Sequence, residues 1–355
     1  MVVVLMSIYV KNKKWKGHLK TYMSMENFPV IKGYNFEEPF DFNKLLESYQ
    51  NMGFQGSNLG TAFKILSNML EEKKHGKLKI WMSFTGNMIS SGNREIIAYL
   101  VKNRIIDGIT TTAASLEEDI IKCIKPLHLG AFDIPGKFLL DESIGGIGNI
   151  LAPMDRYLYF ERFFNDFFEK LLKEFEGIPC TYEVISDMGK FVGSHKLTKK
   201  NCGQSFVYWA AKNNIPVFCP GITDGAMGDL TTFFKRRNPK FAIDVTKDNF
   251  TLTTMLQNTN KAGCIILGGG IAKHFLLNSA IFREGFEYSI YITTANEFDG
   301  SDSGGNQEEA ISWAKIKPNA QRVKVVADAT LIFPLLIAGT ISKIKNNKNN
   351  PKTYK

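Results

Sequence analysis

Residues 78–124 read LKIWMSFTGNMISSGNREIIAYLVKNRIIDGITTTAASLEEDIIKCI. The apolar run over 78–84 is typical of a buried strand, and residues 90–102 carry apolar side chains at helical spacing. A second apolar run over 106–111 and a second helical pattern from residue 116 repeat the alternation. Because a helix between two strands forms a crossover connection, this stretch predicts parallel strands that are covered by helices.

The same alternation returns in the second half of the chain. Runs rich in β-branched and aromatic residues, most of them followed by helical segments, cover residues 215–219, 241–245, 264–267, 288–292 and 323–326. The sequence therefore predicts an α/β fold with a largely parallel, twisted sheet and helices on both faces. In such folds ligands bind in the loops beyond the carboxyl ends of the strands.

Two segments lie between these halves. The first predicts a packing helix with a broad apolar face, formed by Phe163, Phe164, Phe167, Phe168, Leu171, Leu172 and Phe175. The second, residues 180–203, has no clear period and predicts an irregular excursion. Because no repeat and no Pro- or Ser-rich linker divides the chain, we expect a single domain over residues 26–342.

The composition of the 355 residues, with 44% apolar and 22% charged side chains, is that of a folded globular protein. Much of the formal charge of +9 comes from lysines in a basic N-terminal segment, residues 1–25, and in a Lys/Asn-rich tail, residues 343–355, which we expect to be disordered. The body between them is close to neutral, and this argues against a nucleic-acid partner.

The cysteines are scattered and form no Cys-x-x-Cys pair; they are Cys123, Cys180, Cys202, Cys219 and Cys264. This spacing argues against a zinc site and against a disulfide framework, so we expect no metal and a reducing compartment. The apolar run over residues 2–10 is too short to span a bilayer, and its lysines follow it rather than precede it as in a secretory signal. We therefore expect a cytoplasmic protein without a membrane partner.

The first two predicted strands end in small and hydroxyl residues. Residues 85–90 precede a helix N-terminus and suit a phosphate or a ribose, although Ser90 is equally an ordinary helix cap. Residues 111–115 close the second strand, and there Ser115 and Glu118 have the spacing of a capping box. On spacing alone, the capping role is the better interpretation of Glu118.

Glycines and acidic residues follow the later strands. Gly268-Gly269-Gly270 would let the backbone approach a dinucleotide, but Lys273 stands where the Rossmann fingerprint has its third glycine. Acids surround glycines again over residues 224–229 and 299–305. The second of these segments is not a calcium loop, because Ala310 stands where a bidentate Glu is needed.

Several acids in one pocket favour a cationic ligand, and Trp313 is a good partner for an ammonium group. Lys315 follows two residues later. A buried lysine beside another cation can lose its proton near neutral pH and form an imine with a carbonyl compound. On spacing alone, however, Lys315 is better interpreted as a surface lysine.

From Ser57 to Leu336 the chain closely resembles the deoxyhypusine synthase family. The resemblance rests on motifs at residues 57–60, 87–92, 117–119, 147–149, 223–225, 268–270, 297–304 and 313–315. It implies the fold of that family, which is Rossmann-like, and a transferase that binds NAD and oxidises spermidine. The aminobutyl group of spermidine would pass through an enzyme-lysine imine to one lysine of the precursor of translation initiation factor five-A.

The resemblance also implies a role for individual residues. Lys315 would be the covalent nucleophile and His274 the base. NAD would be bound by Asn87, Met88, Ile89, Ser90, Thr112, Ala113, Ala114, Glu118, Asp224, Gly269, Thr294, Ala295, Asp299, Ser303, Asp328 and Ala329. Spermidine would be bound by Glu117, Glu118, Asp229, His274, Asn278, Tyr291, Gly300, Ser301, Asp302, Glu309, Trp313 and Lys315.

At three positions the chain departs from the family, which usually has Ser at Gly86 and Gly at Ala114 and Ala314. A methyl group at Ala114 or Ala314 would crowd backbone that approaches a ligand. The resemblance further implies a homotetramer with sites between paired subunits and an N-terminal segment that covers a neighbour's entrance.

Three other functions were weighed against this one. A homospermidine-forming relative would use putrescine as the acceptor. A catalytically weak paralogue would serve an active subunit as a regulatory partner. An NAD-dependent deacylase of similar fold is disfavoured, because the chain has no zinc-binding cysteine pairs.

Overall fold

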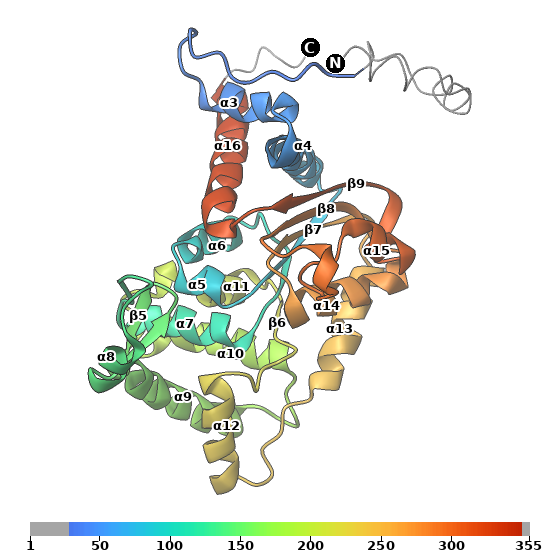
Figure 1. Ribbon diagram of the computed structural model, residues 1–355. Helices are drawn as coiled ribbons and strands as arrows, with labels where there is room; N and C mark the ends of the chain where they lie inside the picture. The colour runs from blue at the N-terminus through green and yellow to red at the C-terminus, as the bar shows by residue number, and fades with distance from the viewer. Residues whose placement is uncertain (1–27, 350–355) are drawn as a thin grey trace.

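Six strands form the central sheet in the order β6-β2-β1-β7-β8-β9, and every neighbouring pair is parallel (Figure 1). The computed structural model describes residues 28–349 of the chain. The strands of this sheet are β1 (Lys79–Phe84), β2 (Gly108–Thr110), β6 (Val217–Phe218), β7 (Ala262–Leu267), β8 (Phe286–Thr293) and β9 (Ile316–Val326). The predicted parallel α/β fold is confirmed.

The strand order reverses beside β1. From β1 the chain adds β2 and then β6 on one side, whereas β7, β8 and β9 follow one another on the other side. The last residue of β1, Phe84, lies opposite the last residue of β7, Leu267. The crevice outside the carboxyl ends of these two strands is where open parallel sheets bind ligands.

Burial on both faces explains why these strands have continuous apolar sequences. All six residues of β7 are buried, and their side chains alternate between two cores. Ile265 and Leu267 belong to the larger core, whereas Cys264 and Ile266 belong to the smaller one. The sheet is therefore a middle layer with helices on either side.

Helices connect the strands and cover both faces (Figure 1). They are α3 (Phe42–Ser48), α4 (Phe54–Lys74), α5 (Asn87–Ser90), α6 (Asn93–Lys102), α7 (Ala113–Ile124), α8 (Gly136–Asp141), α9 (Asp155–Glu174), α10 (Thr181–Ser194), α11 (Phe206–Asn213), α12 (Ala226–Arg237), α13 (Val245–Gln257), α14 (Gly270–Ala280), α15 (Gln307–Ser312) and α16 (Ala329–Asn349). Four short 3-10 turns accompany them: η2 (Tyr49–Asn51), η3 (Cys202–Gln204), η4 (Ile281–Arg283) and η5 (Glu297–Asp299).

A second, antiparallel sheet was not predicted. Its strands are β3 (His128–Leu129), β5 (Ile150–Pro153) and β4 (Ile144–Ile147), in that order. It is inserted between α7 and α9 and ends beside α5 (Figure 1). This position brings the turn between β4 and β5 to the crevice outside the carboxyl ends of β1 and β7.

The aromatic packing helix is confirmed as α9. Phe160, Phe163, Phe164, Phe167 and Phe168 are all buried in the larger core. Phe175 lies just beyond the helix as its C-cap, and Leu172 is largely exposed.

Two local predictions were wrong. Residues 241–245 form no strand: Phe241 packs against Phe168 and Phe234, and the Asp244 side chain caps the start of α13. Residues 180–203 are no irregular excursion, since α10 covers Thr181–Ser194 and begins with a reciprocal cap between Cys180 and Glu183.

At the C-terminal end, α16 continues to Asn349, within the range for which a disordered tail was predicted. The basic segment over residues 1–25 lies outside the described residues. Within the described part of the chain, no helix has the length and apolar character needed to cross a membrane.

Candidate active site

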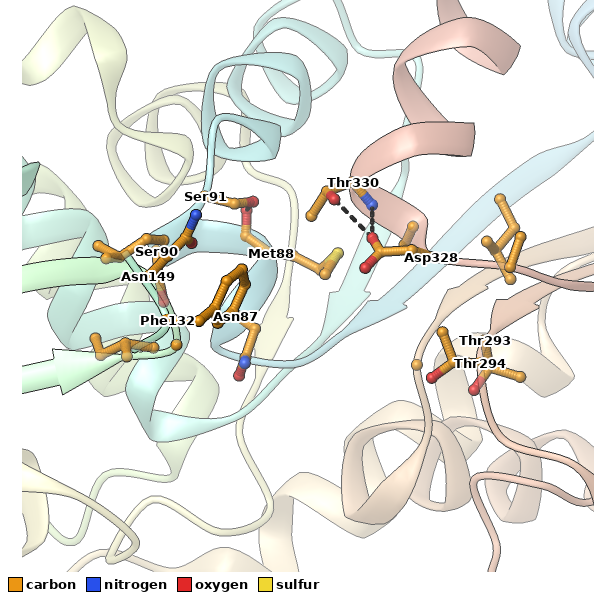
Figure 2. A pocket seen from close by; sticks show the side chains of 17 residues that line it. Asn87, Met88, Ser90, Ser91, Phe132, Asn149, Thr293, Thr294, Asp328 and Thr330 are labelled. Carbon is orange, nitrogen blue, oxygen red and sulfur yellow. Dashed lines mark hydrogen bonds between the residues drawn. The ribbon is translucent and has the colours of Figure 1, made fainter. Parts of the chain in front are cut away.

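A cavity of 320 Å³ lies at the carboxyl ends of β1, β7, β8 and β9. Six of the residues predicted to bind the cofactor line it: Asn87, Met88, Ser90, Thr294, Asp328 and Ala329. Figure 2 shows α5 on one side of the cavity and Asp328, Thr330, Thr293 and Thr294 on the other. The Asp328 carboxylate accepts hydrogen bonds from the backbone N–H and the hydroxyl of Thr330, each 2.6 Å long.

Gly268 also lines this cavity, and its φ of +81° is one that few other residues adopt. The neighbouring Gly269 lies against Ser303, so close that a β-carbon on the glycine would be 2.4 Å from the Ser303 Cα. Two residues predicted to bind the cofactor are therefore in contact, and they join the glycine turn to the loop that carries Asp302.

Glu118 faces the same region but does not cap its own helix. Its carboxylate accepts a hydrogen bond from the Ser90 hydroxyl, whereas the Ser115 hydroxyl bonds to Thr111. Residue 112 is the N-cap of α7 and makes no side-chain cap bond. Burial raises the pKa of Glu118 to about 7. The capping-box interpretation of Glu118 was therefore wrong.

Glu117 points away from Glu118 toward α12. Its carboxylate accepts a hydrogen bond of 3.0 Å from the Met227 N–H. Burial, helped by the nearby carboxylates of Asp224 and Asp229, raises its pKa to about 6. Glu117, Asp224 and Asp229 thus form an acidic group at the N-terminus of α12.

Lys315 and His274 meet at a second place, on the side of the sheet that α14 covers. The Nζ of Lys315 lies 3.1 Å from Nε2 of His274. His274 is on α14, which follows β7, and Lys315 stands between α15 and β9. On its other side, Nδ1 of His274 lies 4.0 Å from Oδ1 of Asp302.

Two polar atoms beside this pair have no partner. Oδ2 of Asp302 and the hydroxyl of Tyr291 are buried without a hydrogen bond to any described residue. A buried polar group without a partner is costly, so such atoms are commonly satisfied by a ligand or by water. Both residues were predicted to bind the polyamine.

Sequence reasoning missed a buried lysine at this place. Lys273 is only 4% exposed, its ammonium donates to the backbone carbonyl of Asp302, and it lies 5.2 Å from the centre of the Tyr291 ring. Burial lowers its pKa, while Asp302 and Glu309 act in the opposite direction. The sequence signal was its position next to His274, directly after a glycine turn.

The pocket also has a wall that was not predicted. Its residues come from the turn between β4 and β5 and from the loop that follows β3: Phe132, Ile147, Gly148, Asn149 and Ile150. Figure 2 shows Phe132 and Asn149 beside α5. The motif at residues 147–149 marked this segment as part of the resemblance, but short strands with two glycines gave no sign that they would reach the site.

The remaining predicted site residues do not line the cavity. Ile89 and Ala113 are fully buried in the larger core, and Ala114 lies behind Gly86. Other predicted site residues are partly or largely exposed at the surface: Thr112, Asn278, Ala295, Asp299, Gly300, Ser301, Glu309 and Trp313.

Asp229 is not joined to the lysine site. Its helix, α12, packs against α7 and α9, whereas α15 packs against β9. The predicted polyamine residues therefore fall into two groups within one chain.

Comparisons with known proteins show which family the chain belongs to. Residues 44–340 match the family model for deoxyhypusine synthase. A probable deoxyhypusine synthase of Drosophila melanogaster is 40% identical over 340 residues, which cover 90% of each chain. One of Methanocaldococcus jannaschii is 44% identical over 315 residues, which cover 87% of this chain and 95% of the relative.

Among solved structures, one from Entamoeba histolytica assigned to deoxyhypusine synthase superposes with a TM-score of 0.59. It is 28% identical in sequence and covers 88% of this chain and 97% of its own. The sheet order, the crevice and the lysine–histidine pair thus occur in a chain that belongs to the deoxyhypusine synthase family, transferases whose known reaction is the NAD-dependent transfer of an aminobutyl group from spermidine to translation initiation factor five-A.

Proposed function

We propose that this chain binds NAD in the cavity at the carboxyl ends of β1, β7 and β8. The lining residues suit NAD, because Asn87, Ser90 and Thr294 offer amide and hydroxyl groups for hydrogen bonds. Gly268, which also lines the cavity, lets the backbone approach the cofactor closely. Bound NAD would take a hydride from the carbon next to the secondary amine of spermidine and later return it. Glu118 and Asp328 would accept hydrogen bonds from its ribose hydroxyls.

The lysine–histidine contact of 3.1 Å carries the catalytic part of the proposal. A lysine forms an imine only as the free amine, so a base within hydrogen-bond reach is required. His274 would take a proton at Nε2, and Asp302 at its Nδ1 side would stabilise the resulting imidazolium. Lys315 would then attack the oxidised spermidine, take its four-carbon unit as an imine with release of diaminopropane, and pass the unit to the acceptor lysine, where the returned hydride would reduce the new imine.

The polyamine would lie beside this pair. A buried ammonium group needs a counter-charge, and Asp302 and Glu309 are the carboxylates near Lys273. The unpartnered Oδ2 of Asp302 and hydroxyl of Tyr291 would accept or share hydrogen bonds with the ligand. Trp313, which is 63% exposed, would cover an ammonium group with its ring.

A homo-oligomer would complete this site. The acidic group formed by Glu117, Asp224 and Asp229 lies apart from Lys315 within one chain. Exposed apolar side chains lie within four residues of His274, Asp302 or Lys315 in the sequence: Ile271, Phe298 and Trp313. We infer that a second subunit, in a tetramer of paired chains, covers these side chains and adds its acidic group to the polyamine site.

One experiment tests the proposed reaction and its acceptor. The purified chain is incubated with NAD and spermidine labelled in the butyl group, and with either the factor precursor or putrescine. We expect label on the factor and none in homospermidine. Label in homospermidine alone would identify a homospermidine-forming enzyme, and no turnover from the chain by itself would favour a paralogue that needs an active subunit.

A further inference from the structure

Lys122 makes an unusual set of contacts beside the cavity. It lies on α7, and its ammonium donates to the backbone carbonyls of Ile89, Ser90 and Ser91, at 2.9, 3.3 and 3.0 Å. These three consecutive carbonyls lie where α5 ends and the chain turns into α6. No motif or resemblance assigned a role to this residue.

The end of α5 needs such a donor. A helix leaves its last carbonyls without partners inside the helix, and α5 has only one turn. An ammonium group has three donor hydrogens and no acceptor, so it can satisfy three carbonyls at once. Burial lowers the pKa of Lys122 because it removes water from around the ammonium group, and the three carbonyls are the hydrogen-bond acceptors that the ammonium has there.

The charged residues near Lys122 are engaged elsewhere, so its ammonium group can bind the three carbonyls. Arg94, on α6, is held by the Asp119 carboxylate at 2.7 Å. Glu118 bonds to the Ser90 hydroxyl, and the side chain of Glu95 is half-exposed. None of these groups makes an ion pair with Lys122 within the described residues.

Glu118 and Lys122 stand one turn apart on α7, and both hold α5. Glu118 accepts from the Ser90 side chain, and Lys122 donates to the backbone that follows it. Asn87, Met88, Ser90 and Ser91 of this segment line the cavity. The two side chains therefore fix the position of the wall that α5 contributes.

We propose that Lys122 is a positioning residue for the cofactor. It holds the α5 turn in the conformation that binds NAD, and Lys122 itself contacts neither spermidine nor the factor precursor. This inference rests on the proposed function, because it assumes that the cavity binds NAD. It predicts that loss of the ammonium group weakens NAD binding and leaves the chemistry at Lys315 unchanged, since His274 lies on α14 and Lys315 on the turn between α15 and β9.

The test uses the full-length chain with Lys122→Met, Lys122→Gln and Lys122→Arg. Lys125→Met is the matched control, because Lys125 is the C-cap residue of α7 and bonds to Asp155 at 2.7 Å. Calorimetry gives the NAD Kd without turnover. Steady-state transfer gives KM for NAD, KM for spermidine and kcat, and thermal unfolding without ligand reports the fold.

We expect Lys122→Met to raise the Kd and KM for NAD about tenfold or more, as the loss of charge-assisted hydrogen bonds implies. Its kcat at saturating NAD and its KM for spermidine should stay within about twofold of the unmodified chain. Lys122→Gln should show the same change to a smaller degree. Lys122→Arg should keep much of the NAD affinity because it keeps the charge. Lys125→Met should bind NAD as the unmodified chain does.

Three results would overturn the inference. In the first, the unmodified chain binds NAD, and Lys122→Gln or Lys122→Met binds it equally well. This result would contradict the role of Lys122 but not the proposed function. Another is an equal loss in kcat and in both KM values, which would mark a general structural role. If the unmodified chain itself fails to bind NAD, the proposed function falls and the inference falls with it.

Discussion

Gly86 and Ala114 compete for one space: a β-carbon on Gly86 would lie 2.6 Å from the β-carbon of Ala114. The resemblance implies Ser and Gly at these two positions, so by that comparison the side chain stands on the other wall in this chain. The methyl group of Ala114 fills space that Gly86 leaves open. The contact indicates that the two departures are coupled.

The coupling predicts a double-mutant cycle. Gly86→Ser alone should lower the free energy of unfolding by about 1 to 3 kcal/mol, because it overpacks this contact. With Ala114→Gly in the same chain, most of that loss should disappear. Urea denaturation of the two single variants and the double variant measures the coupling. Additive effects of the two substitutions would contradict the shared space.

Ala314, next to Lys315, has a φ of +55°. This left-handed conformation costs an alanine about 1 kcal/mol more than a glycine. Ala314→Gly should therefore raise the free energy of unfolding by up to about 1 kcal/mol, less the entropy that glycine adds to the unfolded chain. Ala314→Val should lower it. Chemical denaturation checks both, and a destabilised glycine variant would show that the backbone is not strained here.

Lys315→Arg should abolish transfer to the factor and leave the fold and NAD binding intact, because a guanidinium does not form the imine. Borohydride reduction during turnover should trap an aminobutyl adduct on Lys315 in the unmodified chain and none in the variant. Lys317→Arg is the control, since Lys317 pairs with Glu287 at 2.7 Å and should keep full activity. An adduct on a different lysine would refute the assignment.

Asp302→Asn should weaken spermidine binding at least tenfold and change NAD binding little, because it removes the counter-charge of one ammonium group. Glu308→Gln provides the comparison: Glu308 is exposed and paired with Arg322 at 2.6 Å, so its loss should cost less than about 1 kcal/mol. Calorimetry with each ligand separates the two effects. Equal spermidine affinities in both variants would place Asp302 outside the polyamine site.

The pKa of Glu118 gives a pH-dependent prediction. Its folded-state pKa of about 7 lies above the ordinary value of 4.5, so the stabilisation from its neutral form is complete below pH 4.5 and is lost as the pH rises through 7. The shift corresponds to roughly 3 kcal/mol. Glu118→Gln keeps an acceptor for Ser90 and does not ionise. Its free energy of unfolding relative to the unmodified chain should therefore rise between pH 5 and pH 8, and a constant difference would show that Glu118 is ionised throughout.

The sheet could be predicted from the sequence because its strands are buried on both faces. The runs that became β1, β7 and β8 are almost wholly apolar, and a helix follows β1 and β7 at once. Residues 241–245 have the same composition, yet Phe241 is buried among aromatic side chains of two helices rather than in a strand. An apolar run identifies burial, but its neighbours in space decide the backbone conformation.

Lys315 and His274 could be named from the sequence because the resemblance assigns roles to their own side chains, and the structure brings the two within 3.1 Å of each other. Lys122 and Lys273 act on backbone carbonyls that lie far from them along the chain or across a loop. A carbonyl is present at every position, so no spacing in the sequence reveals such a contact. The wall formed by β4 and β5 was missed for a related reason, since short strands with glycines carry little periodic signal.

The position of β1 in the sheet has a consequence for how the chain folds. During synthesis β1 emerges early and pairs with β2 soon afterwards, but its other neighbour, β7, begins only at residue 262. The side chain of Asn58, on α4, donates a hydrogen bond to the carbonyl of Lys324, which is synthesised 266 positions later. Pairings this distant in sequence form slowly. We therefore expect a nascent chain that exposes a bare strand edge through most of translation, and that depends on chaperones until the last strand leaves the ribosome.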